Sequence, residues 1–368
     1  MKIEQINLHH LRMDLRNPFE TSFGRIHTRD CILIEGFCDG LVGYGECAAD
    51  RDPGYSYETS LTAWHILRDF LIPSILNKDI HNIPEFLNHI QSVRGHPMAK
   101  AGLEMVYWDL LGKIENRPLK DIIGGTYDKV QVGVSIGIQE TPKQLVETVK
   151  EYLSQGYARI KIKIKPGRDV GDTSAVREEF PHLMLQVDAN SAYTLETADS
   201  LLPLDNLNLL LIEQPLPEDD LWDHRQIQKR FKTAICLDES ITSPRHARQA
   251  IEMDACKIIN IKQGRVGGIS QAIEIHNIAY TVDIPVWCGG MLETGVGRAA
   301  NLSLSSLRGF TLPADISATE RYYEEDITVQ SFHLNPDSTI DVPKGPGLGI
   351  DVDPEAMKRA TLEVLIIR

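Results

Sequence analysis

The pattern of apolar and polar positions changes once along the chain, near residue 130. Before that point two β-like runs are followed by two helical patterns, over residues 31–37, 41–46, 58–76 and 98–114. The turn between the two runs holds Asp39 and Gly40, a pair typical of tight β-hairpins. The pattern predicts an α+β unit over about residues 1–125.

After Val130, short apolar runs alternate with amphipathic helical stretches as far as about Asp315. The candidate strands end near eight positions, Gly137, Lys163, Asp188, Glu213, Asp238, Lys262, Cys288 and Asp315. Such alternation is typical of parallel strands joined by crossover helices. Eight strands in this order predict a (β/α)8-type barrel over about residues 126–320. The turn-rich tail, residues 321–368, is expected to pack back on the N-terminal unit.

One helix of this alternation has both of its ends marked in the sequence. Thr141 and Gln144 form a capping box, Pro142 occupies the first helical position, and Gly156 stops the helix. A strand is expected to begin directly after it.

The composition says more about the possible partners of the protein than about its fold. A formal net charge of -14 argues against nucleic acid, because a phosphate backbone requires a basic face. The first residues lack an apolar signal core, and no run of about 18 apolar residues occurs, so we expect no membrane partner and a cytoplasmic location. Small-molecule partners and a homo-oligomer are expected. The cysteines are scattered without a CxxC pair, which favours reduced core thiols at Cys31, Cys38, Cys47, Cys236, Cys256 and Cys288.

Charged residues stand at the carboxyl ends of five successive candidate strands. They are Lys163, Asp188, Glu213, Asp238 and Lys262, and the intervals between them are 25, 25, 25 and 24 residues. Each interval is one strand-helix unit, so the five residues occupy equivalent places around the barrel mouth, where active sites of such barrels lie.

Two structural explanations compete with a functional one. An Asp after a strand often only caps the next helix, and charges in register can form structural ion pairs. Capping does not explain Glu213 or the two lysines, since an unpaired charge buried at the end of an apolar run costs several kcal/mol. We therefore expect these charges to face one another.

The three carboxylates, without a nearby His or Cys, form a hard oxygen donor set that suits Mg²⁺, or Mn²⁺, better than zinc. A substrate carboxylate can fill the remaining coordination positions. The enediolate left when the α-proton of that substrate departs would then be stabilised where its charge develops.

The lysines supply the base and the acid. Lys161 and Lys163 alternate on one strand and point to the same face, so each is expected to disfavour the protonation of the other. Lys163 and Lys262 belong to the second and sixth strands, opposite each other across the ring. One lysine thus faces each side of a planar intermediate, which permits either racemisation or β-elimination.

These residues resemble the muconate-lactonizing subgroup of the enolase superfamily, and within it the o-succinylbenzoate synthase and N-succinylamino acid racemase group. The resemblance covers nearly the whole chain and is carried by RIKIKIKPG (159–167), LQVDANSAYT (185–194), LLLIEQPL (209–216), ICLDESI (235–241), IINIKQGRVGG (258–268) and PVWCGGMLETGVGRAAN (285–301). It implies an α/β fold, a (β/α)7β TIM-like barrel whose α+β capping domain is built from residues 1–125 and 321–368.

The resemblance also implies roles for individual residues. Asp188, Glu213 and Asp238 would be metal ligands, Lys163 and Lys262 acid/base catalysts, and Lys161 the residue that tunes Lys163. Loops 17–25 and 49–55 would close over the barrel mouth. Substrate contacts would come from Phe19, Phe23, Tyr55, Ser135, Asn190, Arg265, Gly289, Gly290 and Met291.

Arg265 stands where the racemase-capable members carry an arginine near the second lysine, and a cation there would lower the pKa of Lys262. A solvated loop arginine is the alternative. Two positions depart from the family pattern: Gln263 replaces the usual proline, and Asp50 stands at an ordinarily apolar lid position.

The leading expectation is o-succinylbenzoate synthase, the Mg-dependent dehydration of 2-succinyl-6-hydroxy-2,4-cyclohexadiene-1-carboxylate in menaquinone biosynthesis. N-succinylamino acid racemase is the alternative, as a second or main activity, and muconate cycloisomerase is a lesser one. Dipeptide epimerase is disfavoured because LPADISAT (312–319) lacks an Asp-x-Asp pair. A barrel that serves only for binding or assembly is the hypothesis from another class.

Overall fold

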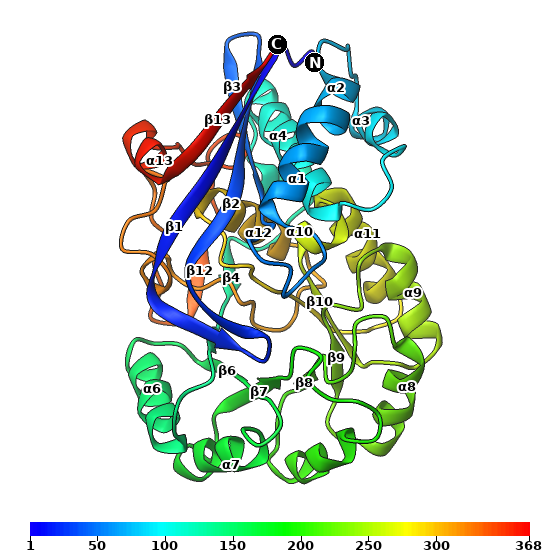
Figure 1. The fold of residues 1–368 in the computed structure, drawn as a ribbon, viewed down its shortest axis with the longest axis vertical. Coiled ribbons are helices and arrows are strands. Elements are labelled where there is room, and N and C mark those ends of the chain that lie inside the picture. The colour runs from blue at the N-terminus through cyan, green and yellow to red at the C-terminus, as the bar shows by residue number, and fades with distance from the viewer.

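A four-stranded antiparallel sheet stands beside a ring of parallel strands in the computed structural model, which describes residues 1–368 (Figure 1). The antiparallel sheet has the order β13-β1-β2-β3, with β1 (Gln5–Thr21), β2 (Gly24–Cys38), β3 (Leu41–Cys47) and β13 (Thr361–Ile367). Asp39 and Gly40 form the predicted turn with φ angles of 48° and 78°, the left-handed conformation that a two-residue hairpin requires. The alternation in the first residues did not predict the long strand β1.

The helices of this unit follow β3 in the chain. They are α1 (Ser60–Ile66), the π-helical η1 (Leu67–Leu71), α2 (Ile72–Ile75), α3 (Ile83–Ile90), α4 (Pro97–Glu115) and α5 (Leu119–Ile122). Two of them, α1 and α4, pack on the sheet. The predicted helical patterns correspond to α1 through α2 and to α4, whereas α3 was not predicted. Helix α4 lies directly on β3, because Gly102 has no side chain. A Cβ there would come within 2.7 Å of the backbone nitrogen of Cys47.

Seven parallel strands follow one another around the ring in chain order. They are β5 (Val134–Ile136), β6 (Arg159–Lys163), β7 (Met184–Asp188), β8 (Ile212–Glu213), β9 (Ile235–Leu237), β10 (Ile258–Ile261) and β11 (Val286–Cys288). The eighth predicted strand, which ends near Asp315, is a closing segment that is joined to its neighbours only by single bridges, Phe310 to Val286 and Ala314 to Val132. Pro313 within it has no N–H to donate to a ladder. The predicted (β/α)7β fold is confirmed, with an irregular last strand.

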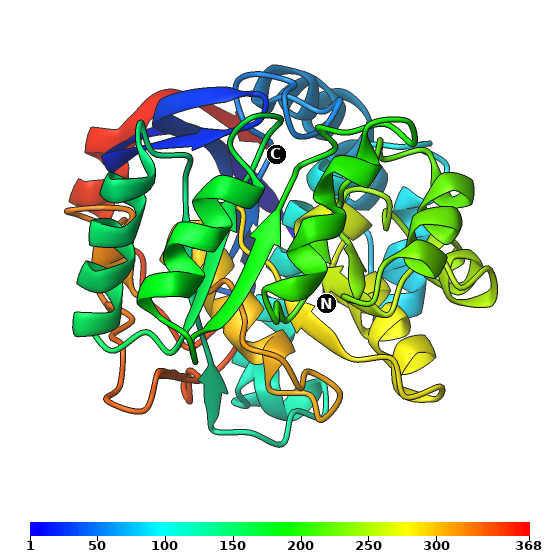
Figure 2. The same cartoon turned by 90° about the horizontal axis from the view of Figure 1, so that it is seen from below.

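Seven connections pack around these strands (Figure 2). They are α6 (Pro142–Ser154), α7 (Val170–Glu179), the 3-10 helix η2 (Ala198–Asn206), α8 (Leu221–Arg230), α9 (Pro244–Glu252), the pair α10 (Gln263–Val266) and α11 (Ile269–Tyr280), and α12 (Gly295–Ser305). Helix α6 begins with the predicted capping box of Thr141 and Gln144. The connection η2 is not an α-helix, because Pro203 lies inside it.

The tail returns to the first sheet. After η3 (Thr319–Arg321), the short strand β12 (Thr339–Asp341) pairs with β4 (Lys129–Gln131) beside the barrel. Helix α13 (Pro354–Ala360) then leads into β13, which pairs with β1, so both termini lie together (Figure 1). The packing of the tail on the N-terminal unit is as predicted, and the domain boundaries at 125 and 320 stay a prediction. All six cysteines are free and buried. None of the helices has both the length and the apolar character needed to cross a bilayer.

Two buried glutamates join the N-terminal unit to the barrel by capping barrel helices. Glu46 on β3 accepts hydrogen bonds from the backbone of Thr294 and Gly297 at the start of α12, at 3.1 and 3.0 Å. Glu104 on α4 accepts one from the backbone of Ser270 in α11, at 2.9 Å. Helix N-termini attract carboxylates, but burial, with a smaller contribution from the Glu293 carboxylate, still raises the pKa of Glu46 to about 7.

This raised pKa predicts a pH-dependent stability. Between about pH 4.5 and 7 the folded protein binds a proton at Glu46 that the unfolded chain releases, so this group makes the free energy of unfolding fall as the pH rises. Glu46 should therefore change the free energy of unfolding by on the order of 2 kcal/mol between pH 5 and pH 8, and this contribution should be absent in the Glu46→Gln variant. Urea unfolding at pH 5 and pH 8 measures it, with exposed Glu4→Gln as the control. Equal slopes in wild type and Glu46→Gln would contradict the prediction.

Candidate active site

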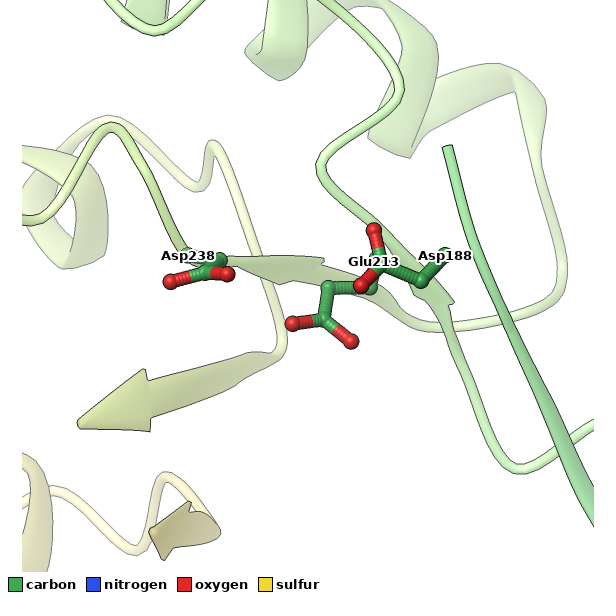
Figure 3. Close-up of side chains that lie close together, drawn as sticks. All are labelled: Asp188, Glu213 and Asp238. Carbon is green, nitrogen blue, oxygen red and sulfur yellow. The ribbon is translucent and has the colours of Figure 1, made fainter. Parts of the chain in front are cut away.

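Three carboxylates meet at the carboxyl ends of neighbouring barrel strands (Figure 3). Asp188 ends β7, Glu213 ends β8, and Asp238 follows β9 directly. One oxygen from each of the three lies within 4.8 Å of the others, and all three residues are fully buried. The structure thus brings together the acids that the 25-residue spacing placed in register.

The chemistry of this donor set fits a divalent cation. The three ligand atoms are hard carboxylate oxygens, the set that Mg²⁺ and Mn²⁺ take in proteins. Burial, followed by the charge of Asp188, raises the pKa of Glu213 to about 8. Neighbouring cations, with Lys163 first for Asp188 and Lys262 first for Asp238, outweigh burial and lower the pKa values of these two acids, so Glu213 is the acid whose charge a divalent cation would stabilise most.

The two predicted acid/base lysines lie on either side of the triad. The Nζ of Lys163 donates to Asp188 Oδ2 at 2.5 Å and to Asn190 Oδ1 at 2.7 Å. The Nζ of Lys262 donates to Asp238 Oδ2 at 2.8 Å. Three strands, β7, β8 and β9, separate β6 from β10 in the sheet. The opposed placement that the sequence predicted is therefore what the structure has.

Lys161 has different neighbours from those expected. It points to the same side as Lys163, but its Nζ lies 2.5 Å from Asp315, 3.1 Å from Glu213 and 3.2 Å from Asp188. Burial alone would lower the pKa of Lys161, but these carboxylates outweigh it and raise the pKa well above its ordinary value. Lys161 therefore acts on the triad directly, as a buried counter-charge, and both lysines of β6 contact Asp188.

Arg265 also differs from its prediction. Its guanidinium does not reach the cavity, and it forms an ion pair with Asp238 and donates from Nε to the Ile241 carbonyl at 2.7 Å. Burial opposes the charge on Lys262, but Asp238 outweighs burial and raises the pKa of that lysine. The net direction is thus opposite to the predicted lowering, and Asp238, the carboxylate that Lys262 shares with Arg265, contributes most to the increase.

A cavity above the triad is lined by seven of the nine residues predicted to contact substrate. They are Phe19, Phe23, Tyr55, Ser135, Asn190, Gly290 and Met291. Gly289 does not line it and instead gives room to Lys262, since a Cβ there would come within 2.6 Å of the lysine Cε. Asp50, the polar residue in the lid, also lines the cavity and lies 3.2 Å from the buried Arg29 of β2. The Gln263 amide is buried with neither of its polar atoms hydrogen-bonded.

Sequence reasoning missed several residues that support the site. Arg159 alternates with Lys161, and Asn260 alternates with Lys262, so strand periodicity gave a signal for both. Arg159 lies 2.5 Å from Asp315, and Asn260 donates to Glu213 at 2.8 Å. Asp315 itself ends the eighth candidate strand. The buried contacts that Glu46 and Glu104 of the N-terminal unit make with the barrel had no comparable signal in the sequence.

The fold and site define a carboxylate-lined barrel enzyme with a capping unit, and the comparisons name the class. The chain belongs to the mandelate racemase / muconate lactonizing enzyme family of the enolase superfamily. The model of its N-terminal domain matches residues 3–124, and the enolase C-terminal domain-like model matches residues 144–356. The resemblance seen in the sequence is confirmed.

The similar proteins within this family narrow the group. The chain is 47% identical over 362 residues to an o-succinylbenzoate synthase of Geobacillus kaustophilus, covering 98% of this chain and 96% of that protein. It is 44% identical to an N-succinylamino acid racemase of Thermus thermophilus, covering 98% of each. A solved structure of an enolase superfamily member from Listeria innocua superposes with a TM-score of 0.95 at 40% identity, over 100% of this chain and 99% of that one. The relatives thus carry both names that the sequence pointed to.

The site predicts a measurable affinity for a divalent cation. Glu213→Gln keeps the size of the side chain but removes its charge. We expect it to weaken binding of Mn²⁺, used as a spectroscopic probe, by about tenfold or more, because altering residues that merely orient ligands already costs that much. Electron paramagnetic resonance titration measures free Mn²⁺. Exposed Glu218→Gln is the control, and an unchanged affinity in Glu213→Gln would contradict the prediction.

Proposed function

We propose that this chain is an o-succinylbenzoate synthase, which dehydrates 2-succinyl-6-hydroxy-2,4-cyclohexadiene-1-carboxylate in menaquinone biosynthesis. The observation that carries the proposal is the placement of Lys163 and Lys262 on opposite sides of a buried carboxylate triad. Several relatives at 44–47% identity over nearly the whole chain have this name. Homo-oligomeric assembly and a cytoplasmic location stay predictions.

We propose Mg²⁺, with Mn²⁺ as a substitute, as the cation held by Asp188, Glu213 and Asp238. When bound, the ion supplies positive charge beside the substrate carboxylate and so lowers the cost of removing the neighbouring proton. The three acids hold the ion, and the ion pairs of Lys161 with Glu213 and Asp188 keep two of these acids in place.

The lysines move the protons. The Nζ of Lys163, as the neutral amine, takes the proton from the ring carbon that carries the carboxylate. The carbon-oxygen bond to the hydroxyl then breaks, and the same Nζ returns its proton to the departing oxygen, which leaves as water. The electron pair of the broken C–H bond completes the aromatic ring. Lys262, as the ammonium on the other face, steadies the negative charge that develops on the substrate carboxylate.

N-succinylamino acid racemase is the second function, and one observation favours it. Lys262 is buried and Lys163 is partly buried, and both are hydrogen-bonded at the triad, so each can exchange a proton with one face of a planar intermediate. Lys163 would take the α-proton from one face while Lys262 delivers a proton to the other. Relatives with this name are 44% and 45% identical to the chain.

The cavity favours a small carboxylate substrate that has no free ammonium group, because its amine is either acylated or absent. Asp315 lies at its wall but is already paired with Arg159 and Lys161, so it is not free to hold a substrate ammonium group. This arrangement argues against a dipeptide epimerase. The Ser135 hydroxyl is buried with no hydrogen-bond partner, and we propose that it binds a substrate oxygen.

Variants that remove one lysine test the two-lysine mechanism. Lys163→Ala and Lys262→Ala should each lower racemisation, and Lys163→Ala should lower dehydration, by about 100- to 10,000-fold, the range for loss of a general acid or base. Each variant should still exchange the α-proton of one enantiomer of a succinylated amino acid in D₂O. Absorbance, polarimetry and NMR follow the three reactions, and circular dichroism checks the fold.

Full racemisation by either variant would refute the two-lysine mechanism. Wild-type protein that neither dehydrates the cyclohexadiene substrate nor exchanges the α-proton in the presence of Mg²⁺ would instead favour a barrel used for binding or assembly.

A further inference from the structure

A segment of the N-terminal unit, residues 50–58, reaches over the barrel mouth and is tied down at both ends. At its start, the Asp50 carbonyl accepts a hydrogen bond from the Ser60 backbone at 2.7 Å, which closes the segment into a loop. Near its end, the buried Glu58 carboxylate accepts from the backbone of Met98 and Ala99, at 2.8 and 3.1 Å, at the start of α4. Between these anchors the backbone has a defined position over the site.

Tyr55 is the residue of this loop that touches the candidate acid/base machinery. Its hydroxyl donates to Asp238 Oδ1 at 2.9 Å and accepts from Lys262 Nζ at 3.1 Å. The same Nζ lies 4.4 Å from the centre of the Tyr55 ring. The amino group of Lys262 is thus held by an oxygen and a ring face that both come from the N-terminal unit.

The other lysine has no such contact. The hydrogen bonds of Lys163 go to Asp188 and Asn190, which both belong to the barrel. The Asn190 amide in turn donates to Glu239 of the barrel at 2.8 Å. Of the two lysines, Tyr55 of the loop therefore contacts Lys262 only, and its one contact with the carboxylate triad is to Asp238, which binds the same lysine.

We infer that Tyr55 is a positioning residue for Lys262, so that proton transfer on that face of the substrate depends on the loop while transfer at Lys163 does not. This inference rests on the proposed lysine mechanism and goes beyond a role for Tyr55 in lining the cavity. A residue that only lined the cavity would act through its ring and would affect both faces alike. The hydroxyl contact makes the expected effect one-sided.

The Tyr55→Phe variant tests this one-sidedness, because it keeps the ring and removes only the hydroxyl. The assay is α-proton exchange in D₂O with each enantiomer of an N-succinylamino acid, in the presence of Mg²⁺. The Lys163→Ala and Lys262→Ala proteins show which enantiomer each lysine deprotonates. Tyr57→Phe is the matched control, since Tyr57 lies two residues away in the same loop with 66% of its surface exposed.

We expect Tyr55→Phe to slow exchange of the enantiomer deprotonated by Lys262 by about tenfold or more, the effect of losing one hydrogen bond to a charged group. The change should fall on kcat, with KM within about twofold of wild type. Exchange of the other enantiomer, and both reactions in Tyr57→Phe, should stay close to wild type. Thermal unfolding confirms that the variant folds.

Equal loss with both enantiomers, or no loss with either, would overturn the inference while leaving the proposed function intact. Wild-type protein that exchanges neither enantiomer would overturn the racemase proposal and this inference with it. The two failures are therefore distinguished by the wild-type reaction alone.

Discussion

The burial of charge at the barrel mouth is the constraint on which the rest of the structure depends. Asp188, Glu213 and Asp238 are fully removed from water, and ionising a buried carboxylate costs several kcal/mol unless positive charge lies beside it. Lys161 and Lys163 of β6, and Lys262 after β10, compensate part of this negative charge. A divalent cation would compensate the remaining negative charge. The buried carboxylates that lower the stability of the fold are therefore the same groups that suit the site to hold a metal and a carboxylate substrate.

The N-terminal unit has to be fixed on the barrel for this site to work. Glu46 and Glu104 reach from that unit to the N-termini of α12 and α11, while Glu58 fixes the loop that carries Tyr55. The hairpin tip of β1 and β2 rests on the same loop, since a Cβ on Gly54 would come within 2.9 Å of the Phe23 ring. Each of these contacts either satisfies a buried polar group or is a close packing contact. Together they fix the position of the N-terminal unit relative to the barrel.

Most of the barrel and of its charged residues was predictable from the sequence. Parallel strands that alternate with helices repeat at nearly constant spacing, so residues at equivalent places in each unit meet at one end of the barrel. Alternation along a strand likewise put Lys161 beside Lys163 on one face. The irregular closing segment and the 3-10 connection η2 departed from this pattern where prolines remove backbone donors, at Pro313 and Pro203.

The sequence by itself determined which residues face the barrel mouth, because strand periodicity and unit spacing are local properties of the chain. Only the tertiary structure decided their partners: Asp315 pairs with Lys161, Asp238 binds both Lys262 and Arg265, and Tyr55 reaches Lys262 from another part of the chain. Those contacts join segments far apart in sequence, and the direction of a pKa shift depends on which charges lie nearest in space. No local pattern contains that information.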